Sequence, residues 1–107
     1  NLTGSISSLP TGLTTLYLYN LGTGIDITTG TMPAWVNNTI TITSGYTTAS
    51  VDGFLNAWSA TATGTTAKTI TLSGTGAGIA NQARSAASDD AVTHLTVTHA
   101  KTIVTTP

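Results

Sequence analysis

Alternating apolar and polar residues mark four short segments of this chain. In each segment the apolar residues fall on one side of an extended strand, and mostly hydroxyl-bearing or aromatic residues fall on the other. The segments begin at Leu16, Ile40, Ile70 and Thr102, so their starts lie 24, 30 and 32 positions apart. Strand-like segments that return at such intervals are typical of stacked repeat proteins. We therefore expect four short parallel strands, over residues 16–19, 39–43, 68–73 and 102–106.

A helical period replaces this alternation after the second strand. Four apolar residues follow the i, i+3, i+4 and i+7 spacing of an amphipathic helix: Val51, Phe54, Leu55 and Trp58. The stripe predicts a helix over residues 51–60, with Ser50 as its N-cap and Asp52 in its first turn. We expect Trp58 to lie in the core.

A second, shorter helix is predicted before the last strand. Ser88 is its expected N-cap, Asp89 and Asp90 lie in its first turn, and a short apolar face follows. That face consists of Ala91, Val92 and Leu95. Residues 31–36 are expected to form one further short turn, with Pro33 near its start.

The composition narrows the classes of function. Thr occurs 26 times, Glu and Cys are absent, and only seven side chains are charged, for a net charge of −1. This balance offers no electrostatic footprint for nucleic acid, and the chain has no thiol for a disulfide. No apolar run approaches the roughly 18 residues of a membrane-spanning helix. So few charges favour a surface that is covered by neighbouring subunits or by glycans.

One group of segments resembles a known module. The group combines an amphipathic helix, a Thr-rich strand, a helix start with two Asp residues and a closing strand. Its segments are residues 51–58, 68–74, 85–92 with Leu95, and 102–106. They are similar to a leucine-rich-repeat-like module of surface proteins of Bacteroidetes-type bacteria and of tail or fibre proteins of their phages.

The resemblance covers residues 36–106 well and residues 1–35 loosely. Leu13, Leu16 and Leu18 have the Leu-x-x-Leu-x-Leu spacing of a leucine-rich repeat. The asparagine that follows the strand of a regular repeat is displaced to Asn20 in the first unit and is missing from the later ones. The resemblance implies an α/β solenoid, with a parallel sheet of about four strands on one side and helices or turns on the other. It also implies adhesion, host recognition or display, without catalytic residues.

Candidate catalytic and cofactor-binding patterns are incomplete. Residues 74–78 follow a strand as a dinucleotide-binding loop does, but the third glycine of that pattern is misplaced. His94 and His99 are five residues apart, and no carboxylate joins them at ligand spacing. No nucleophile elbow positions a Ser-His-Asp set. The sequence therefore predicts no enzyme activity, no cofactor and no metal site.

The outward side of the strands is the candidate binding face. Strand alternation places Tyr17, Thr41, Thr71 and Val104 in one column, Tyr19, Thr43 and Ser73 in a second, and Thr39 and Thr69 in a third. Thr suits an exposed strand face whatever the function, whereas exposed tyrosines are common contacts for carbohydrate or protein. The candidate face comprises Tyr17, Tyr19, Thr41, Thr43, Thr71 and Ser73.

These observations lead to one main hypothesis and two alternatives. The 107 residues are interpreted as a single solenoid domain, expected to be a segment of a longer chain. Residues 1–3 and 37–39 fit the N-glycan acceptor pattern. The main hypothesis is a structural or display protein outside the cell, on the cell surface or on a virion, which self-associates into a fibre or array. The alternatives are an adhesin that reads a glycan or protein through its sheet face and, more remotely, an ice-binding protein.

Overall fold

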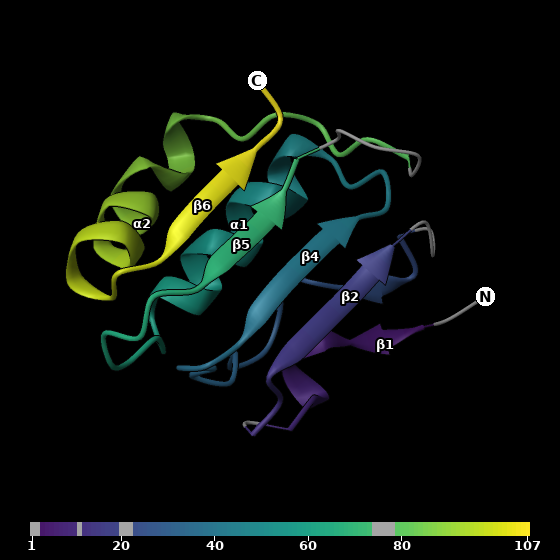
Figure 1. The fold of residues 1–107 in the computed structure, drawn as a ribbon. Coiled ribbons are helices and arrows are strands. Elements are labelled where there is room, and N and C mark those ends of the chain that lie inside the picture. The colour runs from purple at the N-terminus through teal and green to yellow at the C-terminus, as the bar shows by residue number, and fades with distance from the viewer. Residues whose placement is uncertain (1–2, 11, 20–22, 74–78) are drawn as a thin grey trace.

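The computed structural model describes residues 3–10, 12–19, 23–73 and 79–107. Within these ranges the chain is α/β, with parallel strands and two α-helices (Figure 1). The strands are β1 (Gly4–Ser5), β2 (Thr15–Tyr19), β3 (Ile25–Asp26), β4 (Thr39–Thr43), β5 (Thr69–Leu72) and β6 (Thr102–Thr105). The helices are α1 (Thr48–Ser59) and α2 (Asp89–Thr93), with 3₁₀ turns η1 (Ile6–Ser8) and η2 (Ala86–Ser88) and the π-helical turn η3 (His94–Thr98).

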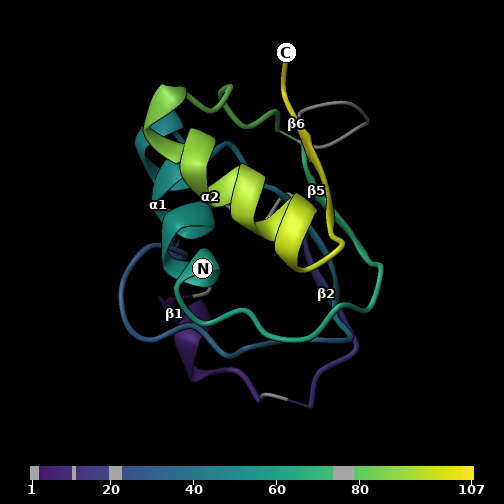
Figure 2. The same cartoon turned by 90° about the vertical axis from the view of Figure 1, so that its left-hand side faces the viewer.

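The four predicted strands form one parallel sheet in the order β2-β4-β5-β6. The helices cover one face of this sheet, and the other face is open (Figure 2). β1 pairs with β3 in a separate small parallel sheet, and β1 lies on the helix side of the main sheet (Figure 2). The alternation of the sequence did not predict this pair, because strands of two residues are too short to show a period.

The core lies between the sheet and the helices. Ile40, Ile42 and Ile70 are fully buried on the inner face of the sheet. The predicted helical stripe packs against them, because its four apolar residues are all at most 1% exposed. The Trp58 indole Nε1 donates a hydrogen bond to the Ala34 carbonyl at 3.1 Å, so this buried ring is satisfied at its polar end. The prediction that Trp58 lies in the core is confirmed.

Three details of the helices and turns differ from the predictions. The N-cap of α1 is Thr47, whose Oγ1 accepts a hydrogen bond from the Ser50 N–H, so Ser50 lies within the helix. Ser88 precedes α2 as predicted, but its hydroxyl makes no cap hydrogen bond and turns toward α1 instead. Residues 31–36 form no helical turn, since Trp35 has a φ of 44°. A φ of that sign is left-handed and cannot continue a right-handed helix.

Candidate binding face and buried polar contacts

The open face of the main sheet carries the two predicted tyrosines. Tyr17 and Tyr19 alternate with the buried Leu16 and Leu18 along β2, as strand geometry requires. Their side chains are 63% and 44% exposed, which is unusual for large aromatic groups. Both are therefore free to contact a ligand or a partner.

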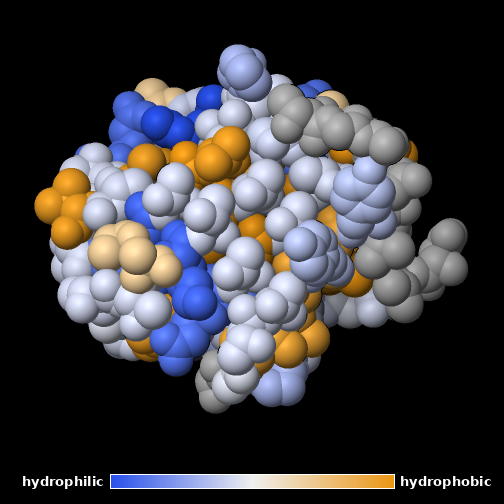
Figure 3. Space-filling view, in the orientation of Figure 1, coloured by the Kyte–Doolittle hydropathy of each residue, from blue (hydrophilic) through white to orange (hydrophobic). Residues whose placement is uncertain are grey.

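The register of the sheet confirms the first predicted column. Tyr17 pairs with Thr41, Thr41 with Thr71, and Thr71 with Val104. Thr41 and Thr71 are half-buried between their neighbours on this column. Figure 3 shows the middle of this side as largely pale, with intermediate hydropathy and apolar areas between, while strongly hydrophilic patches lie toward its left. The face is thus built from hydroxyls and aromatic rings rather than from charges.

The second predicted column is only partly exposed. Tyr19 pairs with Thr43 as expected, but Thr43 and Ser73 are 4% and 2% exposed. Ile79 lies beside the carboxyl end of β4, where Ser44 bridges to it and the Gly45 N–H donates to its carbonyl. Thr43 and Ser73 are therefore not available to a large ligand. The accessible part of the candidate face is Tyr17, Tyr19, Thr41 and Thr71.

Asn81 joins the ends of β4 and β5 and is the residue that sequence reasoning missed most clearly. Its side chain is 2% exposed. Its Nδ2 donates to the carbonyls of Ile42, at 2.5 Å, and Leu72, at 3.1 Å. Its Oδ1 accepts from the N–H groups of Ser44 and Tyr46, at 3.1 and 3.0 Å. One amide thus satisfies four backbone groups.

The position of Asn81 explains why it was missed. The resemblance places an asparagine directly after a strand, whereas Asn81 lies nine residues beyond Leu72. The displaced asparagine of the first repeat unit, Asn20, lies outside the described residues. The same is true of residues 74–78, which were compared with a dinucleotide-binding loop. A single asparagine is a weak sequence signal, because three of its four partners here are 35 to 39 residues away, in β4 and the segment after it.

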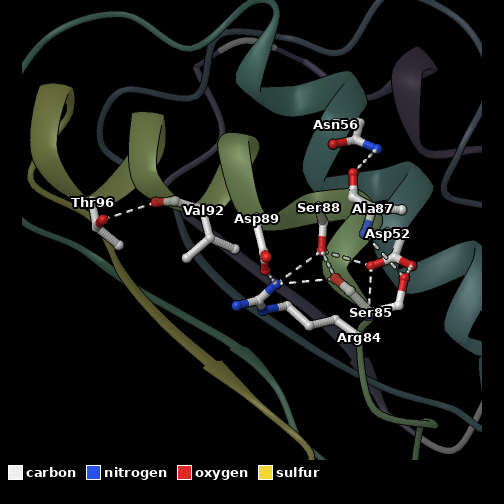
Figure 4. Close-up of polar contacts among 9 residues, drawn as sticks. All are labelled: Asp52, Asn56, Arg84, Ser85, Ala87, Ser88, Asp89, Val92 and Thr96. Atoms are coloured by element: carbon white, nitrogen blue, oxygen red, sulfur yellow. Dashed lines mark hydrogen bonds and ion pairs between the residues drawn. The ribbon is translucent and has the colours of Figure 1, made fainter.

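Asp52 is the centre of a second polar cluster, between α1 and the start of α2 (Figure 4). It is 6% exposed and accepts hydrogen bonds from the Ser85 N–H at 2.9 Å, the Ser85 hydroxyl at 2.5 Å and the Ser88 hydroxyl at 2.6 Å. Arg84 lies beside this cluster and pairs with Asp89 at 2.6 Å. The predicted role of Asp52 in the helix dipole is thus wrong, because α1 begins earlier and Asp52 holds the turn that precedes α2.

Opposing effects act on the Asp52 carboxyl. Burial alone would raise its pKa, but the hydrogen bonds from Ser85 and Ser88 and the charge of Arg84 together lower the pKa below its usual value. Asp52 therefore stays ionised, and the cluster is a structural clamp. The hydroxyls of Ser85 and Ser88 both donate to this carboxylate, and the Ser85 hydroxyl also accepts from the Ala87 N–H.

Lys101 is a buried cation just before β6. It is 3% exposed, and its Nζ donates to the carbonyls of Val36 at 2.9 Å and Thr66 at 2.6 Å. Burial, and then the nearby charge of Lys68, lower its pKa. Lys101 ties together the segments that lead into β4, β5 and β6, so it is part of the fold and unavailable to a ligand.

A hollow opens at the β2 end of the molecule. It has a volume of 290 Å³, and its lining includes the apolar side chains of Ile6, Leu9, Leu16, Leu18 and Ile25. Ile6, Leu16 and Leu18 are buried core residues, whereas Leu9 and Ile25 are partly buried. The hollow at the β2 end of the sheet therefore has a mainly apolar lining.

Comparisons with models of protein families, with curated proteins and with solved structures find no match to this chain. The resemblance to a leucine-rich-repeat-like module accordingly stays a prediction. In the described part of the chain, no helix has the length and apolar character needed to cross a bilayer.

Proposed function

We propose that this chain is a non-enzymatic structural unit, a short solenoid that stacks end to end with copies of itself into a fibre or array. Its place would be outside the cell or on a virion. The carrying observation is that the two ends of the parallel sheet are complementary: within the described residues, β2 and β6 each pair on one edge only. Unpaired strand edges associate with other strands unless they are blocked.

The backbone directions support pairing between these edges. The Thr102 N–H donates to the Lys68 carbonyl, so alternation along β6 turns the N–H groups of Ile103 and Thr105 away from β5. On β2, the Thr14 carbonyl accepts from the Thr39 N–H, so the backbone groups of Tyr17 point away from β4. Within the described ranges, both edges thus turn backbone donors and acceptors away from the sheet, toward the place of an incoming parallel strand.

The side chains support the same arrangement. Thr15, Thr39, Thr69 and Thr102 occupy equivalent positions along the sheet, and the inner position that follows holds Leu16, Ile40, Ile70 and Ile103. A second copy whose β2 lies beside β6 continues both rows. The half-buried Ile103 would then meet Leu16 of the next copy at the apolar hollow. This contact joins different surfaces of the two copies, so it propagates rather than closing as a dimer.

The charge distribution does not oppose stacking. Of the seven charged side chains, Asp52 and Lys101 are buried, and Arg84 is paired with Asp89. Few charges remain to keep copies apart, and a net charge near zero favours association. The low charge of the chain is thus consistent with a surface that is buried in contacts with neighbouring copies.

A proline at the free edge of β6 tests the proposal. Thr105→Pro removes a donor that points away from β5, whereas Thr105→Val keeps that N–H and serves as the matched control. We expect filaments or large oligomers of the native chain and of Thr105→Val in electron microscopy and light scattering, and monomers of Thr105→Pro with an unchanged circular dichroism spectrum. A native chain that stays monomeric at high concentration would contradict the proposal.

The exposure of Tyr17 and Tyr19 favours a second candidate function, recognition of a glycan or protein by the open face of the sheet. Replacing both with serine keeps the backbone edge of β2 while removing the rings. Loss of binding in a glycan array with assembly intact would support adhesion. Loss of assembly would instead assign the tyrosines to the contact between copies.

A further inference from the structure

The two histidines of the described chain converge at the end of the helical layer. The Nε2 atoms of His94 and His99 lie 3.0 Å apart, and the two rings are inclined by 80°. The other nitrogen of the buried His99 ring, Nδ1, lies 2.8 Å from the Gly64 carbonyl. A carbonyl can only accept, so His99 donates from Nδ1, and the neutral form of this tautomer has its lone pair on Nε2, the atom that faces His94.

The π-helical turn η3 creates this convergence. Five residues of an ordinary α-helix rotate by about 500°, which would place His94 and His99 about 140° apart around the axis. The wider π-helix closes on i, i+5 instead, and such turns are rare and often found at functional sites. Ala100 then has a φ of 57°, a conformation uncommon for a residue other than glycine, and the chain leaves the helix directly after His99. Sequence spacing alone therefore gave no reason to pair the two rings.

We propose that His94 and His99 bind one divalent transition-metal ion through their Nε2 atoms, with water completing the coordination. Histidine ligands sit about 2.0 Å from such ions. With that bond length, a separation of 3.0 Å between the two nitrogens corresponds to an angle of about 97° at the metal. This angle is nearer the square arrangement of Cu²⁺ or Ni²⁺ than the tetrahedron of Zn²⁺.

The ring positions distinguish a metal pair from a straight hydrogen bond. A linear N–H···N bond of this length would hold the ring centres about 5.4 Å apart, given about 1.2 Å from each nitrogen to its ring centre. Two rings aimed at one metal would have centres about 4.8 Å apart. The observed separation is 4.6 Å. The observed separation is thus nearer to that of two rings that share one ion than to that of a straight hydrogen bond.

The surroundings suit an ion that arrives from solvent. His94 is exposed and lines a shallow depression with Asp90, which lies one helical turn earlier and brings a negative charge. The bond from His99 Nδ1 to a backbone carbonyl is the usual support of a metal-binding histidine. No group of three or more potential His, Cys, Asp or Glu ligands gathers in the described chain. Two imidazoles with water suit Cu²⁺ best, because it binds such sites most tightly among these ions.

Titration of the untagged protein with Cu²⁺ tests this site. We expect one ion per chain by calorimetry and an electron paramagnetic resonance spectrum with two imidazole nitrogens. His94→Ala, at an exposed position, should weaken binding at least about tenfold and leave one imidazole nitrogen. Thr98→Ala changes an exposed residue of the same turn and should bind as the native chain does. Ni²⁺ and Zn²⁺ should bind more weakly than Cu²⁺.

Two results would overturn the proposal. One is equal Cu²⁺ affinity in the native chain and in His94→Ala, with both variants folded by circular dichroism. The other is a native spectrum that shows a single nitrogen ligand, which would reduce the pair to a hydrogen bond. Neither measurement depends on assembly, because the Thr105→Pro variant keeps both histidines and can be titrated in the same way.

Discussion

Replacing Asp52 with asparagine should destabilise the fold while changing its shape very little. The carboxylate accepts three hydrogen bonds from Ser85 and Ser88 in a site that is 6% exposed. Hydrogen bonds to a charged group contribute about 1.5–3 kcal/mol each, and those between neutral groups about 0.5–1.5 kcal/mol. In the asparagine, an NH₂ group replaces one of the carboxylate oxygens. It cannot accept the hydrogen bonds that Ser85 and Ser88 donate at that position. We expect Asp52→Asn to lower the free energy of unfolding by about 2–3 kcal/mol.

The assay is urea denaturation at pH 7, followed by circular dichroism, with thermal melting as a second measurement. A loss of this size corresponds to a fall in Tm of about 10–20 °C for a domain of this length. Asp90→Asn is the matched control, because it removes the same charge from an exposed site at the start of α2. The control should lose less than about 1 kcal/mol, the contribution of a carboxylate at a helix N-terminus.

Acid should remove the difference in the free energy of unfolding between the native chain and Asp52→Asn. The pKa of Asp52 is lower in the folded state than in the unfolded state, where it is near the usual value for Asp. Its contribution is therefore complete above the unfolded pKa and is lost as the pH falls through the folded pKa. The difference between the two proteins should shrink below about pH 4. A difference under about 0.5 kcal/mol at pH 7, or one that stays constant down to pH 3, would refute the role assigned to Asp52.

Three further predictions concern other buried or constrained groups. Asn81→Ala leaves four backbone groups without their partner, and should cost at least about 3 kcal/mol in urea denaturation. Gly64 has a φ of +74°, and an added Cβ would meet a Val36 methyl at 2.6 Å, so Gly64→Ala should cost about 1–2 kcal/mol by thermal melting. Gly12→Ala, where nothing lies within 4 Å, should be nearly neutral. The hydroxyl of Thr29 and the backbone N–H and hydroxyl of Thr28 lower the pKa of Asp26 to about 2, so Asp26→Asn should flatten the acid unfolding curve between pH 4 and 2.

The strands and the main helix were predictable because their signals are local. In β4 the alternation of Thr with Ile40 and Ile42 places apolar groups on one face, and this requires only the period of an extended chain. The stripe that ends at Trp58 follows from the helical period in the same way. The starts of α1 and η3 were less predictable, because several hydroxyl residues compete as N-cap and because a π-turn has no distinct composition.

The candidate face was predictable in its columns but not in its exposure. Strand alternation alone placed Tyr17 beside Thr41 and Tyr19 beside Thr43. Alternation did not predict that Thr43 is only 4% exposed. Register is a property of neighbouring strands, whereas burial depends on every segment that crosses the face.

By itself the sequence determined the α/β class and the parallel row of strands, because apolar period and strand spacing are written in consecutive residues. Only the tertiary structure decided which polar groups meet. Asp52 reaches Ser85, Asn81 reaches Ile42, and Lys101 reaches Val36 across separations of 33, 39 and 65 residues. Hydrogen bonds act over about 3 Å, so contacts of this kind form only after the strands and helices have packed, and the composition of the chain carries no record of them.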